Sequence, residues 1–198
     1  MTATFLLIRH GATDDLDVRL SGRRPGVPLN EAGRAQAGAL ARRLADERID
    51  AILSSPLDRT RETAEAIARS KAMAVTIDDA LIEIDLGEWT GATFAMLHDD
   101  RRWHWWNAER VTACCPGGET MAQAQARIVG LLRRLAAERD GETIALVTHS
   151  DLIRAALCDV LGLDLAGVHR LQVDPASVST VVIGDWGGKL LNLNVAAG

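Results

Sequence analysis

The chain has 198 residues, a length for which one domain is a better expectation than two. Apolar residues make up 47% of the chain and charged residues 25%, a balance that is typical of folded proteins and excludes a disordered chain. The net charge of −5 lacks the basic excess that nucleic-acid binding requires, and no apolar run reaches the roughly 20 residues of a membrane span.

The N-terminus has no basic region followed by a long apolar stretch, so the sequence predicts no secretion signal. The three cysteines, Cys114, Cys115 and Cys158, cannot all pair within one chain. Because disulfides persist in oxidising compartments, an odd number of cysteines favours a reduced protein. We therefore expect a cytoplasmic protein that binds neither membranes nor nucleic acid.

Strand-like and helix-like segments alternate along the first part of the chain. An apolar run followed by Arg9, His10 and Gly11 predicts a buried strand that opens into a loop, and Asn30 is typical of a helix cap. In chain order, the predicted elements are a strand at 5–8, a helix from 30 to about 44, a strand at 51–53, a helix over about 58–68 and a short strand at 75–77.

The segment from about residue 84 to residue 118 has no clean period and contains most of the tryptophans. We expect about 89–116 to be a small cap inserted over one edge of the fold, with the tryptophans as its own core. A second interpretation stays open, in which Trp103 and Trp106, one helical turn apart, form a lid that contacts the substrate.

Regular structure resumes after this segment. The predicted elements are a helix over about 119–139, a strand at 143–147, a helix over about 152–161, and two strands at 178–183 and 189–195 around a glycine-rich hairpin turn. The alternation predicts the α/β class, as a three-layer α/β/α sandwich with a mostly parallel central sheet. We expect residues 1–198 to form a single domain.

Three of the predicted strands end in polar or reactive side chains. These are Arg9 with His10, Ser54 with Ser55, and Thr148 with His149. Since ligands bind beyond the carboxyl ends of parallel strands, we expect the three ends to form one site, which Arg59 joins from a helix. Two histidines and two arginines at one point repel each other unless an anion lies among them, and a phosphoryl group fits this requirement.

The order and spacing of these residues resemble the histidine phosphatase superfamily, which contains the cofactor-dependent phosphoglycerate mutases and many small-molecule phosphatases. The resemblance covers nearly the whole chain. Its motifs lie at residues 7–13, 20–22, 28–37, 54–60, 81–91, 116–120 and 148–149. An Arg-His-Gly triplet alone is a weak signal, whereas the ordered set is specific.

The resemblance implies a role for each of five residues. His10 is the nucleophile that accepts the phosphoryl group, and Glu83 is the general acid and base. Arg9, Arg59 and His149 form the electrostatic cradle of the phosphate. His10 must be neutral in order to attack, and the nearby arginines favour its neutral form.

Glu83 must hold a proton for the leaving oxygen, which requires a raised pKa. Asp85 and Glu88 are alternatives for this role, and spacing alone does not separate them from Glu83. We choose Glu83 because it stands at the position that the resemblance implies.

The chain departs from the common pattern of the superfamily at three positions. Leu16 stands where many relatives have a phosphate-binding asparagine, Ser150 where glycine is common, and Ala12 where glutamate or glutamine is common. Ser21, beside Gly22, is a candidate replacement for the missing donor. We therefore include Ser21, Gly22 and Ser150 among the candidate substrate-binding residues.

The arginines and His149 supply the positive charge that a metal supplies in other phosphatases, so we expect no metal and no other cofactor. The carboxylates at 14–17 are an alternative cation site, but no further ligands occur at a recognisable spacing. A solvated acidic loop is the favoured interpretation of that segment.

These observations predict a metal-independent phosphomonoester hydrolase that acts on a small phosphorylated metabolite through a phosphohistidine. The chain is shorter than the phosphoglycerate mutases that it resembles, which favours a phosphatase. Two alternatives stay open: a phosphoglycerate-type phosphomutase, and a phospho-ligand binding or signalling protein with little turnover. A monomer and a homodimer are both compatible with the resemblance.

Overall fold

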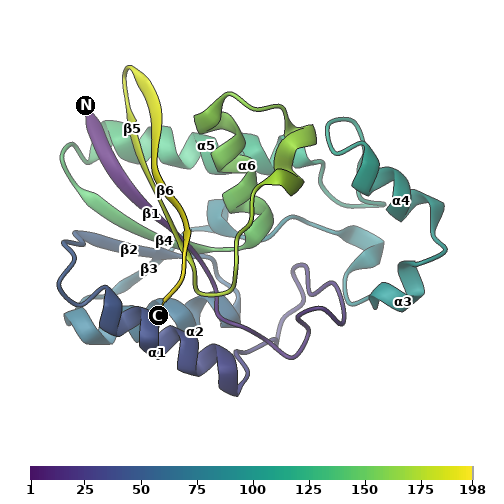
Figure 1. Ribbon diagram of the computed structural model, residues 1–198, viewed down its shortest axis with the longest axis horizontal. Coiled ribbons are helices and arrows are strands. Elements are labelled where there is room, and N and C mark those ends of the chain that lie inside the picture. The colour runs from purple at the N-terminus through teal and green to yellow at the C-terminus, as the bar shows by residue number, and fades with distance from the viewer. Residues whose placement is uncertain (198) are drawn as a thin grey trace.

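A computed structural model describes residues 1–197 and contains one six-stranded sheet (Figure 1). The strands are β1 (Thr2–Arg9), β2 (Ala51–Ser54), β3 (Val75–Ile77), β4 (Thr143–Thr148), β5 (Val178–Gly184) and β6 (Gly187–Val195). Their order across the sheet is β3-β2-β4-β1-β5-β6. The first four are mutually parallel, and β5 and β6 are antiparallel to their neighbours. The mostly parallel sheet is therefore confirmed.

Helices cover both faces of this sheet (Figure 1). The helices on the two faces are α1 (Glu31–Arg43) and α2 (Asp58–Lys71), and α5 (Met121–Glu138) and α6 (Ser150–Leu161). Two short helices, α3 (Phe94–Leu97) and α4 (Arg101–Ala108), lie between β3 and α5 in the chain. Single 3-10 turns occur at Asp79–Leu81 and Gly87–Trp89, and a longer one at Leu165–Arg170. No helix within residues 1–197 combines the length and the apolar character that a bilayer crossing demands.

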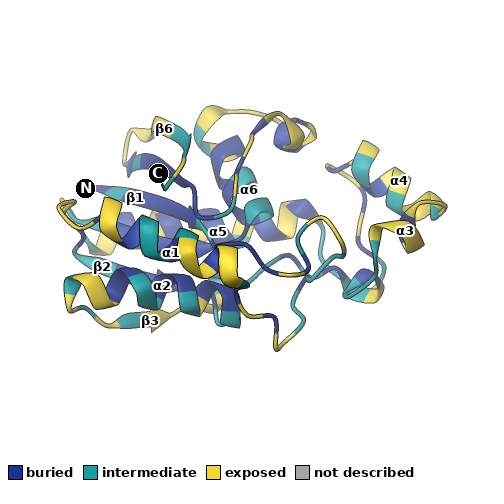
Figure 2. Cartoon of the chain, turned by 60° about the horizontal axis from the view of Figure 1, so that its bottom comes forward, coloured by how far each residue is buried: buried dark blue, intermediate teal, exposed yellow. Residues whose placement is uncertain are grey.

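Strand β1 shows how the sequence produces three layers. Side chains alternate between the two faces of a strand, and β1 is apolar on both. Phe5 and Leu7 belong to the hydrophobic core under α5 and α6, whereas Leu6 and Ile8 belong to a second core under α1 and α2. Figure 2 shows the buried central strand β1 beside helices whose outer sides are exposed, whereas the edge strands β3 and β6 are partly exposed. The predicted α/β/α sandwich is confirmed.

The segment between β3 and α5 is more regular than its sequence predicts. It contains the short helices α3 and α4, which Figure 2 shows standing apart from the sheet with many exposed residues. Each begins at a side-chain cap, because Thr93 accepts a hydrogen bond from the backbone of Met96 and Asp100 accepts one from that of Arg102. Helices this short bury too few residues to produce a visible period, so the pattern did not predict them.

Within this segment, the backbone at 85–88 is joined to the backbone at 116–119. The backbone N–H of Glu88 donates to the carbonyl of Pro116 over 2.9 Å, and that of Glu119 donates to the carbonyl of Asp85 over 2.8 Å. The contact is close, since a Cβ added at Gly87 would lie 2.0 Å from the Pro116 carbonyl oxygen. The chain therefore leaves the sandwich and returns to it at one place. Its division into one domain with 89–116 as a cap stays a prediction.

Helix α1 supports the loop that follows β1 through a contact that only glycine permits. A Cβ added at Gly33 would lie 2.0 Å from the carbonyl oxygen of Ala12, and one added at Gly11 would lie 2.6 Å from the carbonyl oxygen of Gly33. Two stretches of backbone thus touch directly. This contact fixes the position of the loop that carries His10.

Substitution Gly33→Ala is expected to lower the free energy of unfolding by about 1–3 kcal/mol, because the added methyl group must push the backbone of this loop aside. Urea denaturation would measure the change. Gly38→Ala in the same helix is the matched control, since the nearest atom to an added Cβ there is Arg42 Nη1 at 3.7 Å. Alanine at this position should stabilise the helix by up to about 1 kcal/mol. Equal changes in the two variants would contradict the steric argument.

Candidate active site

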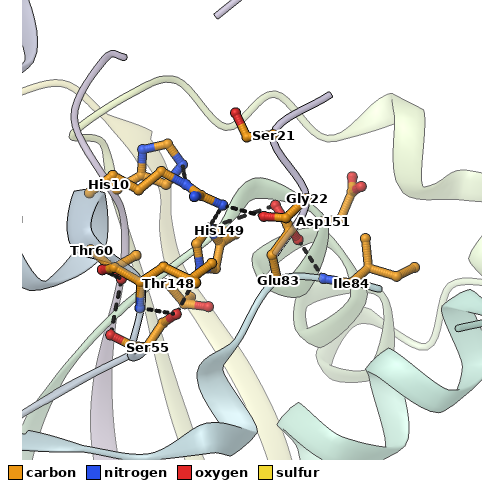
Figure 3. A network of polar contacts seen from close by, with 12 residues as sticks. His10, Ser21, Gly22, Ser55, Thr60, Glu83, Ile84, Thr148, His149 and Asp151 are labelled. Carbon is orange, nitrogen blue, oxygen red and sulfur yellow. Dashed lines mark hydrogen bonds and ion pairs between the residues drawn. The ribbon is translucent and has the colours of Figure 1, made fainter. Parts of the chain in front are cut away.

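A cavity of about 310 Å³ opens beyond the carboxyl ends of the parallel strands. Strands β1, β2 and β4 end beside it, as the sequence predicts. Its wall includes Arg9, His10, Arg59 and Glu83, which come from separate parts of the chain. Figure 3 shows His10, His149 and Glu83 gathered in one polar network. The rings of His10 and His149 have their centroids 5.2 Å apart.

His10 follows β1 and is buried. Its Nδ1 lies 2.7 Å from the carbonyl oxygen of Gly11, which can only accept, so Nδ1 carries the proton and Nε2 carries the lone pair. Burial is the largest cause that lowers the pKa of His10 well below its ordinary value, and the charges of Arg59 and Arg9 lower it further. His10 is therefore a neutral imidazole at neutral pH with Nε2 available as a nucleophile.

Two buried guanidinium groups lie in the same wall. Arg59, in the first turn of α2, is only 2% exposed and donates from Nη2 to the carbonyl of Gly22 over 2.7 Å. Arg9 donates from Nη1 to the carbonyl of Val173 over 2.7 Å. Burial lowers the pKa of both arginines, but a guanidinium group is so basic that both stay charged at neutral pH.

Each of these arginines keeps a nitrogen with no hydrogen-bond partner among residues 1–197: Nη1 of Arg59 and Nε of Arg9. A buried charged donor without a partner is costly, and a bound anion removes that cost. The wall is thus suited to an anion with several acceptor oxygens. Arg59 Nε also donates to Nε2 of His10 over 3.3 Å, which places the nucleophile and the anion donors together.

His149 lies behind the cavity wall and is completely buried. Its Nδ1 accepts from Nη2 of Arg59 over 3.2 Å, and its Nε2 lies 2.9 Å from the hydroxyl of Ser55. Burial and the charge of Arg59 lower the pKa of His149 well below its ordinary value. His149 therefore holds Arg59 in place here, and its direct contact with a phosphate stays a prediction. Ser55, at the end of β2, is the partner that fixes its ring.

Glu83 is the carboxyl group of the cavity. Its Oε1 accepts from the backbone of Ile84 over 2.9 Å, and its Oε2 lies 3.8 Å from Nδ1 of His149. Burial, together with the negative charge of Asp151, raises the pKa of Glu83 from its ordinary value of 4.5 to about 7, against the opposing effect of Arg59. About half of the molecules then carry a protonated Glu83 at neutral pH.

The two alternatives to Glu83 lie elsewhere. Asp85 is ion-paired with Arg23 over 3.5 Å, and Glu88 with Arg102 over 3.1 Å. Neither belongs to the wall of the cavity. The structure therefore distinguishes Glu83, which lines the cavity, from Asp85 and Glu88, which do not. Sequence spacing alone could not distinguish the three.

The remaining predicted residues also lie at the cavity. Ser21, Gly22, Leu16 and Ser150 line it, and Ser150 is the first residue of α6. The hydroxyl of Ser21 donates to Asp15 over 2.8 Å, so in this state it is occupied by a carboxylate. Whether Ser21, Gly22 and Ser150 contact substrate stays a prediction.

The acidic segment 14–17 agrees with the predicted solvated loop at Asp14 and Asp17, which are exposed, and differs from it at Asp15. Asp15 is buried and ion-paired with Arg24 over 3.2 Å and with Arg19 over 3.4 Å. Arginines farther along the chain cover it, which the local sequence does not reveal. Within residues 1–197, no three histidine, cysteine, aspartate or glutamate side chains come together as metal ligands.

Sequence reasoning missed the far side of the cavity, where Asn107, Arg110, Asp151 and Arg154 line the wall. Arg110 lies in a stretch without a motif, so no signal pointed to it. Asp151 had a signal, because it stands two residues after His149 and the first turn of a helix faces the ligand side of such a sheet. Figure 3 shows Asp151 beyond Glu83 in the same network.

A cavity with unpartnered arginine donors at the carboxyl edge of an α/β/α sheet, together with a neutral histidine and a carboxyl group of raised pKa, is the arrangement of a phosphatase of the histidine type. The family model described as "Histidine phosphatase superfamily (branch 1)" matches residues 5–196. The chain belongs to this superfamily.

Several of its relatives and structural neighbours are named phosphatases, and others are named probable phosphoglycerate mutases. The chain is 34% identical over 198 residues to phosphoserine phosphatase 1 of Hydrogenobacter thermophilus, a match that covers 96% of this chain and 91% of the relative. The structure of a mycobacterial glucosyl-3-phosphoglycerate phosphatase superposes with a TM-score of 0.88 at 28% identity, covering 99% of this chain and 100% of that one. A putative α-ribazole-5′-P phosphatase from Escherichia coli gives a TM-score of 0.87 at 25% identity, with 97% and 96% covered. The predicted enzyme class is confirmed.

Proposed function

We propose that the chain is a metal-independent phosphatase that hydrolyses a small phosphorylated metabolite through a phosphohistidine on His10. One observation carries the proposal. The neutral Nε2 of His10 lies beside a buried guanidinium group, Arg59, which keeps a nitrogen without a partner among residues 1–197. The relatives are named for phosphoserine, glucosyl-3-phosphoglycerate and α-ribazole-5′-P, and these names support a small phosphorylated substrate.

The first chemical step transfers the phosphoryl group to the protein. Nε2 of His10 forms a bond to phosphorus while the bond between phosphorus and the leaving oxygen breaks. Glu83 gives its proton to that oxygen, so the alcohol leaves as a neutral molecule. The hydrogen bond from Arg59 to Nε2 is lost, and the same N–H then donates to a phosphoryl oxygen. Arg9 and Arg59 thus stabilise the charge that spreads over the phosphoryl oxygens.

The second step releases phosphate. The carboxylate of Glu83 takes a proton from water, the water oxygen bonds to phosphorus, and the bond between phosphorus and Nε2 breaks. The products are inorganic phosphate and neutral His10, with the proton back on Glu83. His149 stays neutral and holds Arg59 during both steps, because its Nδ1 accepts the hydrogen bond from Nη2 of Arg59.

The test is a panel of small phosphorylated metabolites assayed for phosphate release with and without a chelator. At least one member is expected to be hydrolysed at an unchanged rate when the chelator is present, because arginines supply the positive charge. Activity that disappears with the chelator would contradict the metal-free mechanism. An isomerised phosphate ester without free phosphate would instead identify a phosphomutase. The cytoplasmic location and the monomeric or dimeric state stay predictions.

A further inference from the structure

The cavity contains a second guanidinium site away from His10. Arg110 is 5% exposed and lines the same cavity as Arg9 and Arg59. Its Nη2 donates to Oδ1 of Asn107 over 3.0 Å, and its plane is held 4.4 Å from the ring centroid of Trp106. Nε and Nη1 of Arg110 have no hydrogen-bond partner among residues 1–197. The side chain is therefore fixed in position while two of its nitrogens are left to donate.

The charges around Arg110 define what it can bind. Nη1 lies 4.0 Å from Oδ2 of Asp151, which is beyond hydrogen-bond distance. Asp151 also faces Arg154, whose Nη1 is 3.5 Å away. Two arginines share this one close aspartate, and Glu83 and Asp174 are the other acidic groups that act on Arg110 and Arg154. The two unpartnered nitrogens of Arg110 can therefore receive an anion, and a singly charged group is repelled by Asp151 less strongly than a dianion is.

The surrounding surface limits the size and character of the ligand. Phe94, Trp103 and Trp106 line the cavity on the same side and provide an apolar wall for a short carbon skeleton. The cavity of about 310 Å³ also has to hold the phosphoryl group at His10. A small phosphomonoester with a second, singly charged planar group can place its phosphoryl group at His10 and the second group at Arg110.

From these contacts we infer that Arg110 binds a carboxylate of the substrate, so that the preferred substrates are small phosphorylated carboxylic acids. The inference rests on the proposed function for the phosphoryl end of the cavity. Arg110 acts on substrate selection and takes no part in transferring the phosphoryl group. Arginine is suited to this task because its planar donors match the planar carboxylate.

The test compares 3-phosphoglycerate with glycerol 3-phosphate, which differ only in a carboxylate against a hydroxymethyl group. Affinities are measured by calorimetry with the His10→Ala protein, which binds without turnover. We expect 3-phosphoglycerate to bind about 100-fold more tightly, because a charge-assisted hydrogen bond in a buried site is worth a change of this order. Arg110→Met should remove this preference and change the affinity for glycerol 3-phosphate by less than about threefold.

Arg110→Lys is the second variant, because it keeps the positive charge and the packing if Arg110→Met loosens the segment. It should keep part of the preference, about tenfold, since an ammonium group reproduces the charge but not the planar donors. Equal affinity of the His10→Ala protein for the two probes, or an equal loss for both probes in each Arg110 variant, would overturn the inference. Because binding is measured without turnover, a failure of phosphate release in the metabolite panel would be seen separately and would count against the proposed function.

Discussion

Substitution His10→Ala is expected to reduce kcat by about 10⁴-fold or more, because the variant lacks the nitrogen that forms the phosphohistidine. Among the described residues, His10 is the only histidine that lines the cavity, since His149 lies behind the cavity wall. The guanidinium groups remain in the variant, so substrate binding should survive the loss of chemistry. A large fall in kcat with little change in affinity is therefore the expected signature.

Rapid acid-free quenching with substrate labelled at phosphorus would detect the intermediate directly. The wild-type protein should carry label that is stable in base and released in acid, as a phosphorus–nitrogen bond requires, and His10→Ala should carry none. His104→Ala is the matched control, because His104 is exposed on α4, its ring bonds to the carbonyl of His98, and it does not belong to the cavity wall. Label that persists on the His10→Ala protein would disprove the assignment of the nucleophile.

Substitution Glu83→Gln is expected to reduce kcat/KM by about 10²- to 10⁴-fold, because glutamine cannot give a proton to the leaving oxygen. In the wild type the pKa of Glu83 is raised to about 7, so the group is protonated below that pH and ionised above it. The kcat/KM of the wild type should therefore fall above about pH 7, and this alkaline limb should be absent from Glu83→Gln.

The leaving group provides a sharper version of this test. An aryl phosphate leaves as a stable phenolate and needs little proton donation, so Glu83→Gln should affect its hydrolysis much less than that of an alkyl phosphate. Glu88→Gln is the matched control, because Glu88 is exposed and paired with Arg102 outside the cavity. An equal loss for alkyl and aryl substrates in Glu83→Gln would show that Glu83 has a structural role only.

Protein stability gives an independent readout of the same group. A carboxyl whose pKa is higher in the folded state than in the unfolded state favours folding when it is protonated. The free energy of unfolding should therefore decrease between pH 4.5 and about 7 relative to Glu83→Gln, and then level off. The full difference is at most about 3 kcal/mol. Thermal or urea unfolding of the two proteins over this range would measure it.

The fold could be predicted from the sequence because its local signals agree with one another. Continuous apolar runs predict buried parallel strands, and the runs at 5–8 and 143–147 became β1 and β4 at the centre of the sheet. Asn30 and Thr120 cap the helices that follow them through hydrogen bonds to the backbone. Helices α3 and α4 were missed because each is too short to show a period, and because the mutual packing of Trp89, Trp103 and Trp106 leaves no local pattern.

The candidate site could be predicted only in part. The histidines and Arg59 stand at strand ends or in the first turn of a helix, so topology brings them to one edge whatever the detailed packing. The pKa shifts of His10 and Glu83 could not be predicted from local sequence. Burial is their largest cause, and burial depends on the whole fold. The contact between Arg110 and Asp151 joins two distant segments, and no local pattern encodes it.

The segment between Glu88 and Cys115 is closed at its base. This closure separates the residue inferred to select the substrate from the residues proposed to transfer the phosphoryl group. The ends of the segment bond to each other through the backbone of Asp85, Pro116 and Glu119, so the exposed parts of the span can change in length or sequence while its base stays closed. Glu83 lies outside that span, and Arg110 lies within it. If Arg110 selects the substrate as we infer, exchange of this span would change the substrate specificity, while His10, Arg59 and Glu83 would be kept for phosphoryl transfer.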